Sequence, residues 1–164
     1  GPMTNPAGAK RQVIGVFSQD WQYKMAEVLK LLGSEHALIV HSQGLDEIRL
    51  DAPSSVVELK AGTISQYEIH PQQFGFAKRD AAQLNALVAT STDSSLALIK
   101  QSLTDDTSAA ADIVSLNAGA SIYVAGVATS LGNGIAMAQD AIATGLANER
   151  FNELVRVTKM MVAT

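Results

Sequence analysis

The sequence predicts an α/β domain: a mostly parallel sheet flanked by helices, with a β-hairpin and a helical carboxyl-terminal part. Residues 12–41 read as a strand, a helix and a strand. Residues 55–69 contain two β-branched runs joined by a glycine turn, and beyond Pro71 the apolar residues recur at helical spacing. A strand–helix–strand unit joins parallel neighbours by a right-handed crossover, which is typical of α/β folds.

The first unit opens with an apolar run at residues 13–17, as expected for a buried parallel strand. Ser18 or Asp20 can cap the helix that follows, and Gly33 stands where a left-handed residue ends a helix. The apolar positions of this helix are Met25, Val28, Leu29 and Leu32. Residues 37–41 supply the second strand, which completes the unit.

A hairpin and a series of helices follow. Residues 55–59 and 63–69 are two strands whose three-residue connection ends at Gly62, and imperfect alternation in the second strand predicts a half-exposed edge. Gly119 and Gly126 lie two helical turns apart and would let another backbone approach. Four sets of residues, mostly apolar, recur at helical spacing and each predict one helix. The first three are Leu96, Ile99 and Leu103; Ile113, Leu116 and Ala120, in a helix over about 112–127; and Ile135, Ala138 and Ile142, in a helix that ends at Gly145. The last helix is expected to bury a stripe formed by Phe151, Leu154, Val155, Thr158 and Met161.

Composition excludes several classes of protein. The chain has 164 residues, 47% hydrophobic and 17% charged, which suits one globular domain rather than a disordered segment. The absence of cysteine excludes disulfides and thiolate metal sites and favours a cytoplasmic location. A net charge of -4 argues against a nucleic-acid partner, and the apolar runs are too short for a membrane span.

The candidate site is the run from His41 to Glu47, directly after a predicted strand. Ligands of α/β sheets gather beyond the carboxyl ends of strands, and the adjacent carboxylates of Asp46 and Glu47 suit Mg²⁺, which prefers hard oxygen ligands. An acidic surface turn explains the same two residues. His41 could act as a general base or be held by backbone groups, whereas His36 and His70 are expected at the surface or in turns.

Residues 132–134 (GNG) suggest a nucleotide-binding loop at first sight. They follow no predicted strand and lack the full glycine fingerprint, so the start of a helix near Ser130 explains them better.

The chain resembles the anthranilate phosphoribosyltransferases of tryptophan biosynthesis. The resemblance rests on residues 1–7 (GPMTNPA), 44–48 (GLDEI) and 117–120 (NAGA), together with the hairpin at 58–69 and the FGF at 74–76. Their order and spacing agree across nearly the whole chain. The resemblance implies that residues 1–164 are the carboxyl-terminal portion of a phosphoribosyltransferase or nucleoside phosphorylase-like α/β domain. The sheet would then be partial, without the family's small helical amino-terminal domain.

The resemblance also implies a reaction, in which anthranilate displaces pyrophosphate from phosphoribosyl pyrophosphate to give phosphoribosylanthranilate. Asp46 and Glu47 would bind the accompanying Mg²⁺, and Pro2 and Asn5 would line the anthranilate channel. The reaction requires no covalent intermediate, and no residue of the chain is assigned as a catalyst. The complete enzyme is expected to be a homodimer.

The family's phosphate loop, its dimer-forming helices and its anthranilate-contacting arginine precede the position of Gly1. The isolated chain is therefore expected to be inactive, and to self-associate or pair with the missing amino-terminal half. Gly1 and Pro2 fit the family motif but also resemble a protease scar. Two alternatives are a related pyrimidine nucleoside phosphorylase and a non-catalytic relative that binds nucleic acid.

Overall fold

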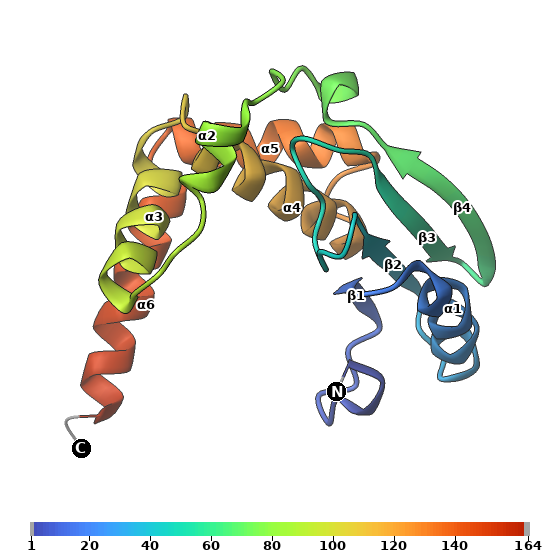
Figure 1. The fold of residues 1–164 in the computed structure, drawn as a ribbon. Coiled ribbons are helices and arrows are strands. Elements are labelled where there is room, and N and C mark those ends of the chain that lie inside the picture. Colours follow the sequence, from blue (N-terminus) through green and yellow to red (C-terminus); the bar gives the residue numbers. More distant parts are fainter. Residues whose placement is uncertain (1, 163–164) are drawn as a thin grey trace.

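The computed structural model describes residues 2–162, with the side chains of all of these except Pro2 and Ala81. Figure 1 shows a sheet with one helix beside it, α4 and α5 running away from the sheet, and α3 and α6 lying together at the far end. The elements are, in chain order and with η for a 3-10 helix, η1 (Pro2–Thr4), β1 (Arg11–Gly15), η2 (Gln19–Trp21), α1 (Gln22–Leu31), β2 (His36–His41), β3 (Ser54–Lys60), β4 (Thr63–Ile69), η3 (Pro71–Phe74), α2 (Ala81–Asn85), α3 (Thr92–Thr104), α4 (Ala109–Ala125), α5 (Leu131–Ala143) and α6 (Leu146–Val162).

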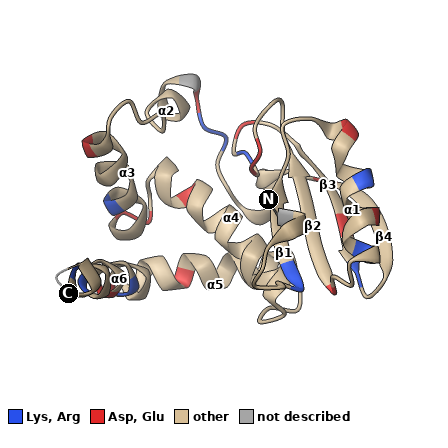
Figure 2. Ribbon diagram, turned by 90° about the horizontal axis from the view of Figure 1, so that it is seen from below, with Lys and Arg blue, Asp and Glu red and all other residues tan. Residues whose placement is uncertain are grey.

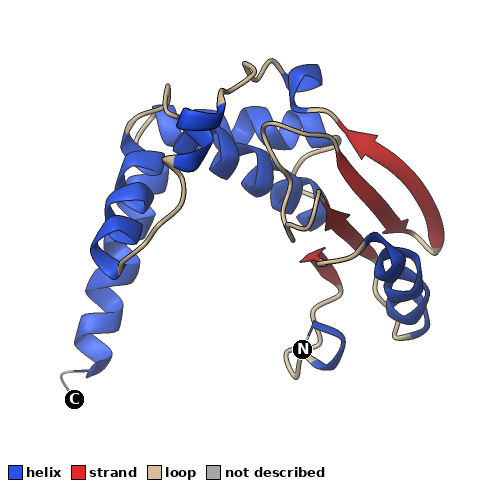
Figure 3. Ribbon diagram, in the orientation of Figure 1, coloured by secondary structure: helices blue, strands red, loops and turns tan. Residues whose placement is uncertain are grey.

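The α/β class is confirmed, with the strands in the first half of the chain and most of the helices in the second. Figure 3 shows the strands gathered in one sheet and most of the helices beside it. The strand order is β1-β2-β3-β4. Only β1 and β2 are parallel, and the other two neighbouring pairs are antiparallel, so the sheet is mixed rather than mostly parallel. The reason is that only the first connection contains a crossover helix, α1, whereas the next two reverse the chain directly.

The hairpin between β3 and β4 is confirmed, with a shorter loop than predicted. Lys60 pairs with Thr63, so the loop consists of Ala61 and Gly62 alone. Both residues have positive φ, 48° and 78°, as a type I′ turn requires. As predicted, β4 is an edge strand with most of its residues outside the core.

The core lies in two layers, one on each face of the sheet. On one face the buried residues of α1 meet the sheet, and on the other α4 and α5 do; the largest buried side chains include Leu29, Leu38, Ile39, Leu59, Leu116 and Ile135. Helix α1 buries Gln22, Ala26 and Leu29, not the predicted Val28 and Leu32. The Gln22 amide donates to the backbone oxygens of Ile39 and Ser55, at 2.6 and 2.8 Å, which turns that face of the helix inward.

Helices α4 and α5 pack backbone against backbone. A Cβ on Gly119 would lie 2.5 Å from the Cα of Ile135, and a Cβ on Gly134 would lie 2.3 Å from the oxygen of Gly119. Gly119 thus behaves as predicted, but Gly126 instead ends α4 with φ 80°. The Ser130 side chain caps α5 by accepting from the Asn133 amide, which confirms the helix start predicted there.

The predicted buried stripe on the last helix is wrong, because α6 has no buried residue. Its side chains Leu154 and Met161 are 61% and 73% exposed. Within the described residues α6 packs mainly on α3 and the end of α5, as Figure 1 also shows, so its apolar face has too few neighbours to cover it. None of the helices within residues 2–162 is long and apolar enough to cross a membrane.

His36 is buried, contrary to the prediction of a surface residue. Its Nε2 lies 2.8 Å from the Glu58 carboxylate, and the Tyr123 hydroxyl donates to the same oxygen at 2.8 Å. The rings of His36 and Tyr123 meet edge to face, with centroids 4.8 Å apart. His36 lies on β2, Glu58 on β3 and Tyr123 on α4, so these hydrogen bonds connect the three elements and satisfy the buried polar groups.

The surroundings of Tyr67, beside Glu58, predict that the free energy of unfolding falls at alkaline pH. Burial, and then the Glu58 carboxylate, raise the pKa of Tyr67 well above its usual 10.0. The folded state therefore favours the neutral phenol, an advantage that is complete below pH 10 and lost as the pH rises toward the folded-state pKa. We expect the free energy of unfolding to fall by up to about 1.4 kcal/mol per pH unit above about pH 10 for this one group.

Urea unfolding followed by circular dichroism between pH 9 and 11.5 measures this slope, and Tyr67→Phe should flatten it. Tyr23→Phe, on the exposed side of α1, is the matched control and should keep the parent slope. An unchanged slope in Tyr67→Phe contradicts the expectation.

Candidate active site

The acidic pair lies in the loop that follows β2. Immediately after the strand, Ser42 and Leu45 exchange two backbone hydrogen bonds, of 2.9 and 3.0 Å, around Gln43 and Gly44. The two central residues have positive φ, 46° and 86°, so the turn reverses the chain tightly. The Ser42 hydroxyl donates to the Pro53 oxygen at 2.7 Å and closes the base of the loop. This tight turn connects the end of β2 directly to Asp46.

The backbone of Asp46 rests on the end of β1. A Cβ built on Gly15 would lie 1.6 Å from the Asp46 oxygen and 2.5 Å from its carbonyl carbon. Only glycine allows this approach, because any side chain would occupy the position of the Asp46 peptide. Since β1 and β2 are parallel neighbours, the acids lie beside the carboxyl ends of both strands, as predicted.

Helix α4 holds the other side of the acidic pair. The side-chain oxygen of Asn117 accepts from the Ile48 amide at 3.0 Å, and its Nδ2 donates to the Ile48 oxygen at 2.9 Å. The same Nδ2 donates to the Ile113 oxygen, one turn earlier in the helix, at 3.0 Å. Ile48 itself is fully buried in the core. Asn117 therefore satisfies both backbone groups of the residue that follows Glu47.

The two carboxylates differ in surroundings. Glu47 lines an open cleft of about 520 Å³ and a neighbouring one of about 260 Å³, and Asp46 is not among the residues lining either. Partial burial, and next to it the Asp46 carboxylate, raise the pKa of Glu47, while Arg49 opposes this. Two adjacent carboxylates that raise each other's cost of ionisation repel, so a cation bound by both would be favourable.

The larger cleft has an apolar wall and a charged rim. Its apolar residues include Leu45, Leu50, Leu84, Leu87, Val88 and Ile113. On the rim, Arg49 holds Asp51 through two hydrogen bonds, one of them 2.6 Å, and this interaction lowers the pKa of Asp51. The cleft adjoins Glu47 and is wide enough for a small ligand.

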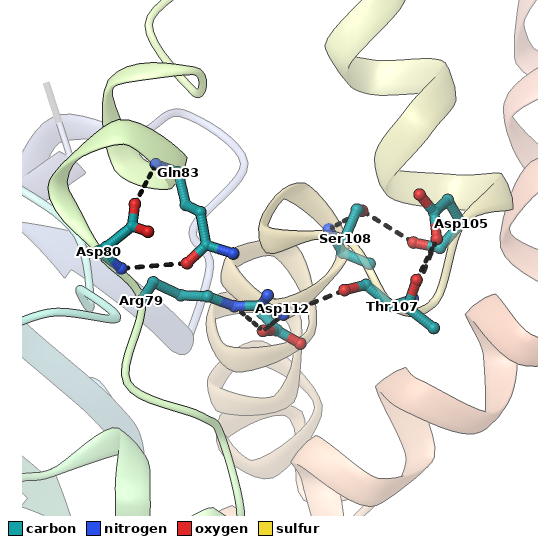
Figure 4. Close-up of polar contacts among 8 residues, drawn as sticks. Arg79, Asp80, Gln83, Asp105, Thr107, Ser108 and Asp112 are labelled. Atoms are coloured by element: carbon teal, nitrogen blue, oxygen red, sulfur yellow. Dashed lines mark hydrogen bonds and ion pairs between the residues drawn. The ribbon is translucent and has the colours of Figure 1, made fainter.

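Arg79 also lines this cleft. It donates to the Asp112 carboxylate, through Nε at 2.9 Å and also through Nη2, and to the Thr107 oxygen at 3.1 Å (Figure 4). Asp80, the next residue, caps α2 by accepting from the Gln83 amide at 2.8 Å. These bonds attach the segment before α2 to the start of α4.

His41 and His70 contact groups of the protein itself. His41 Nδ1 lies 2.8 Å from the Val16 oxygen, so backbone holds this ring, as one of the two predicted alternatives required. His70 lies at the surface 3.5 Å from Glu68, as expected.

Asn5, one of the two residues predicted to line an anthranilate channel, lies away from the clefts beside Glu47. Asn5 precedes β1, accepts from the Ala7 amide at 2.9 Å and lines a separate pocket of about 160 Å³ beside the end of α1. That pocket shares no residue with the clefts beside Glu47. The side chain of Pro2 lies outside the described residues. The contact of Pro2 and Asn5 with a substrate stays a prediction.

The donor set suits a cation shared with a ligand rather than a closed metal site. Within residues 2–162 no group of three or more His, Asp or Glu side chains is placed to hold a metal. Two carboxylates with the remaining ligands from water and phosphate is the usual arrangement for Mg²⁺. Figure 2 shows Lys and Arg spread over separate elements, so a bound anion would depend on local contacts rather than on a broad basic face.

The fold and the acidic loop define an α/β domain with its candidate ligand site at strand ends. Residues 1–148 match the model of the glycosyl transferase family, a/b domain. The chain belongs to this family.

Its relatives carry a more specific name. The anthranilate phosphoribosyltransferase of Teredinibacter turnerae is 50% identical over 98% of this chain, and that of Ectopseudomonas mendocina is 51% identical over 96%. The crystal structure of the enzyme from Thermus thermophilus superposes with a TM-score of 0.80 at 38% identity over 95% of the chain and 46% of the neighbour. A Saccharomyces cerevisiae anthranilate phosphoribosyltransferase in complex with PRPP and Mg shares the fold, with a TM-score of 0.75 at 21% identity over 91% of this chain and 43% of that one. The chain spans 48% and 46% of the lengths of the two curated relatives.

Sequence reasoning found the acids but missed the residues that hold them. Gly15 was read only as part of an apolar strand, although a glycine at a strand end is a signal of close backbone approach. Asn117 was singled out only as part of a motif. An asparagine inside an otherwise apolar helix could have indicated a side chain that bonds to backbone outside the helix.

Proposed function

We propose that this chain supplies the metal-binding acids, and part of the phosphoribosyl pyrophosphate site, of an enzyme that transfers the phosphoribosyl group to anthranilate. The products are phosphoribosylanthranilate and pyrophosphate, and the reaction belongs to cytoplasmic tryptophan biosynthesis. The observation that carries the proposal is the pair Asp46 and Glu47, held at the strand ends in a chain that is 50% identical to one anthranilate phosphoribosyltransferase. The absence of cysteine agrees with a reducing compartment.

Asp46 and Glu47 would hold Mg²⁺, the ion named with PRPP in the yeast relative. When bound, the ion would neutralise charge on the leaving pyrophosphate. The chain's own contribution is to hold the two acids at the strand ends, with Glu47 lining a cleft that Arg49 and Arg79 also line, each of them paired with a carboxylate. The clustered acids, which repel each other without a partner, are suited to a cation that arrives with an anionic substrate.

The reaction needs positioning more than covalent chemistry. The amine of anthranilate attacks the ribose C1 as the bond to pyrophosphate breaks, and the sugar gains oxocarbenium character in the transition state. Asn5 and Pro2 are proposed to contact anthranilate.

The relatives are about twice as long as this chain, so we assign turnover and dimer formation to a protein of their full length. The chain alone is expected to show no turnover of anthranilate, since it carries only part of the proposed pocket. Comparing anthranilate with thymidine as ligands of the full-length protein separates this reaction from a nucleoside phosphorylase: tight thymidine binding without anthranilate binding would overturn the proposal.

Replacing Glu47 with glutamine should remove metal binding and slightly stabilise the fold. Because its pKa is raised above 4.5, the folded state favours the protonated carboxyl, and this preference is lost as pH rises through the folded-state pKa. At pH 7 a neutral isostere therefore avoids the cost of partly burying a charge and the repulsion from Asp46, a gain of less than about 1 kcal/mol at this largely solvent-accessible position.

Mn²⁺ affinity, measured by paramagnetic broadening of the amide signals of residues 44–48, tests the metal site, and thermal unfolding tests stability. Asp46→Asn should also lose Mn²⁺ affinity, by about tenfold or more if each acid is a ligand. Glu68→Gln, on the edge strand, is the matched control and should leave Mn²⁺ affinity unchanged. Equal Mn²⁺ affinity in all the proteins would exclude the site.

A further inference from the structure

We infer that Asn117 is a positioning residue for the metal site: its side-chain amide fixes the backbone of Ile48 and thereby sets where Glu47 points. The inference rests on the proposed function, because it assigns a purpose to the geometry of Asp46 and Glu47. It concerns a residue on α4 that lies outside the acidic loop and is not itself proposed to touch the metal or the substrate.

The hydrogen bonds of Asn117 have the pattern of a strand partner. Through Oδ1 and Nδ2 it binds both the N–H and the C=O of Ile48, as a neighbouring strand would. Residues 42–53 form no strand of the sheet, so the Ile48 backbone, which accompanies a fully buried side chain, depends on this amide.

The orientation of Asn117 is itself fixed. The Nδ2 group also donates to the Ile113 oxygen in the same helix, at 3.0 Å, so the amide has partners on both the helix and the loop. Asparagine is unfavourable in the middle of a helix compared with alanine or leucine. The polar contacts to Ile48 give this residue a role there that an apolar one could not fill.

Glu47 is thus held from both sides. On its amino-terminal side the Asp46 peptide packs against Gly15, where a Cβ would come within 1.6 Å of the Asp46 oxygen. On its carboxyl-terminal side the Ile48 peptide is bound by Asn117. Only Glu47 lies between these two anchored peptides, and it lines both neighbouring clefts. Partners that orient metal ligands typically change metal affinity by about 10–100-fold when they are lost.

The test compares Asn117→Ala and Asn117→Leu with the parent chain. Leucine has the same number of side-chain heavy atoms, branched at the same carbon, and is a better helix former, so it removes the hydrogen bonds without leaving a cavity. Two quantities are measured: hydrogen exchange of the Ile48 amide, and Mn²⁺ affinity from paramagnetic broadening of the Asp46 and Glu47 amides. We expect faster exchange at Ile48 and about tenfold weaker Mn²⁺ binding in both variants, in chains that remain folded.

Two controls separate positioning from general destabilisation. Ser121→Ala removes a hydroxyl, one turn after Asn117 in α4, that donates to the backbone oxygen of Asn117 within the same helix. Ile142→Val removes a buried methyl group from α5, at a cost of about 0.5–1.5 kcal/mol, without touching the loop. Both should bind Mn²⁺ as the parent does.

The outcomes distinguish this inference from the proposed function. Parent-like Mn²⁺ affinity in Asn117→Leu, with binding at Asp46 and Glu47 intact in the parent, would overturn the role of Asn117 and leave the metal site standing. Equal losses in Asn117→Leu and Ile142→Val would also overturn it, because stability alone would then explain the effect. A parent chain that shows no broadening at Asp46 and Glu47 would overturn both.

Discussion

Replacement of Gly15 by alanine is expected to displace the acidic loop and to destabilise the fold by about 1–3 kcal/mol or more, as overpacking of close contacts does. The new methyl group would meet the Asp46 oxygen at 1.6 Å and the carbonyl carbon at 2.5 Å. Both atoms belong to the backbone, so no side-chain rotation can relieve the contact. Either the end of β1 or residues 42–48 must move, and Mn²⁺ binding at Asp46 and Glu47 should be lost with that movement.

The matched control for this substitution is Gly62→Ala in the hairpin turn. Gly62 has φ 78°, but no atom lies within 4 Å of an added Cβ, so alanine there causes backbone strain alone. That strain costs about 1–2 kcal/mol and should not change Mn²⁺ affinity. Urea unfolding and paramagnetic broadening report the two effects separately. Retained Mn²⁺ affinity in Gly15→Ala would show that the Asp46 backbone is not confined as the structure indicates.

The elements of this fold were readable from the sequence where local chemistry decides them. The start of α5 followed from Ser130, a cap residue before an apolar pattern, and the hairpin followed from Gly62 between two β-branched runs. The direction of β3 was harder, because an antiparallel return and a parallel crossover leave the same apolar pattern in the strand. Only the connection differs, and residues 42–53 contain no helix.

The burial of a side chain was predictable only where the element that covers it lies close by in the sequence. The periodicity of α6 predicts an apolar face, but periodicity does not say which element covers that face. Helix α6 packs on α3 and α5, and this contact leaves Leu154 and Met161 exposed. His36 fails in the opposite direction. Its burial depends on Glu58 and Tyr123, which lie 22 and 87 positions further along the chain, and no local signal announces a partner so distant.

The candidate site shows the same division. Asp46 and Glu47 were found because a strand end followed by two acids is a local pattern. Gly15 and Asn117 hold that pair from β1 and α4, and this arrangement exists only after the elements pack. The pair is also at a local energetic disadvantage, since burial and like charge raise the pKa of Glu47. Gly15 and Asn117 fix the backbone on both sides of Glu47 despite this disadvantage, as the proposed cation site would require.

The contact between α4 and α5 leads to the second large expected effect, from Gly134→Ala. A Cβ at Gly134 would lie 2.3 Å from the Gly119 oxygen and 3.3 Å from the Tyr123 nitrogen, again backbone atoms. The two helices must separate, and we expect a loss of about 1–3 kcal/mol, or a Tm lower by roughly 2–12 °C.

The neighbouring Gly132→Ala is the matched control within the same helix. There the nearest atoms are ring carbons of Phe74 at 3.7 Å, an ordinary contact. Since alanine favours a helix over glycine, Gly132→Ala should stabilise the protein by up to about 1 kcal/mol. Differential scanning calorimetry of the two variants should therefore give Tm shifts of opposite sign. A Gly134→Ala variant whose Tm equals or exceeds that of the parent would mean that α4 and α5 do not pack through Gly119 and Gly134, and that the helix carrying Asn117 is held against the sheet in some other way.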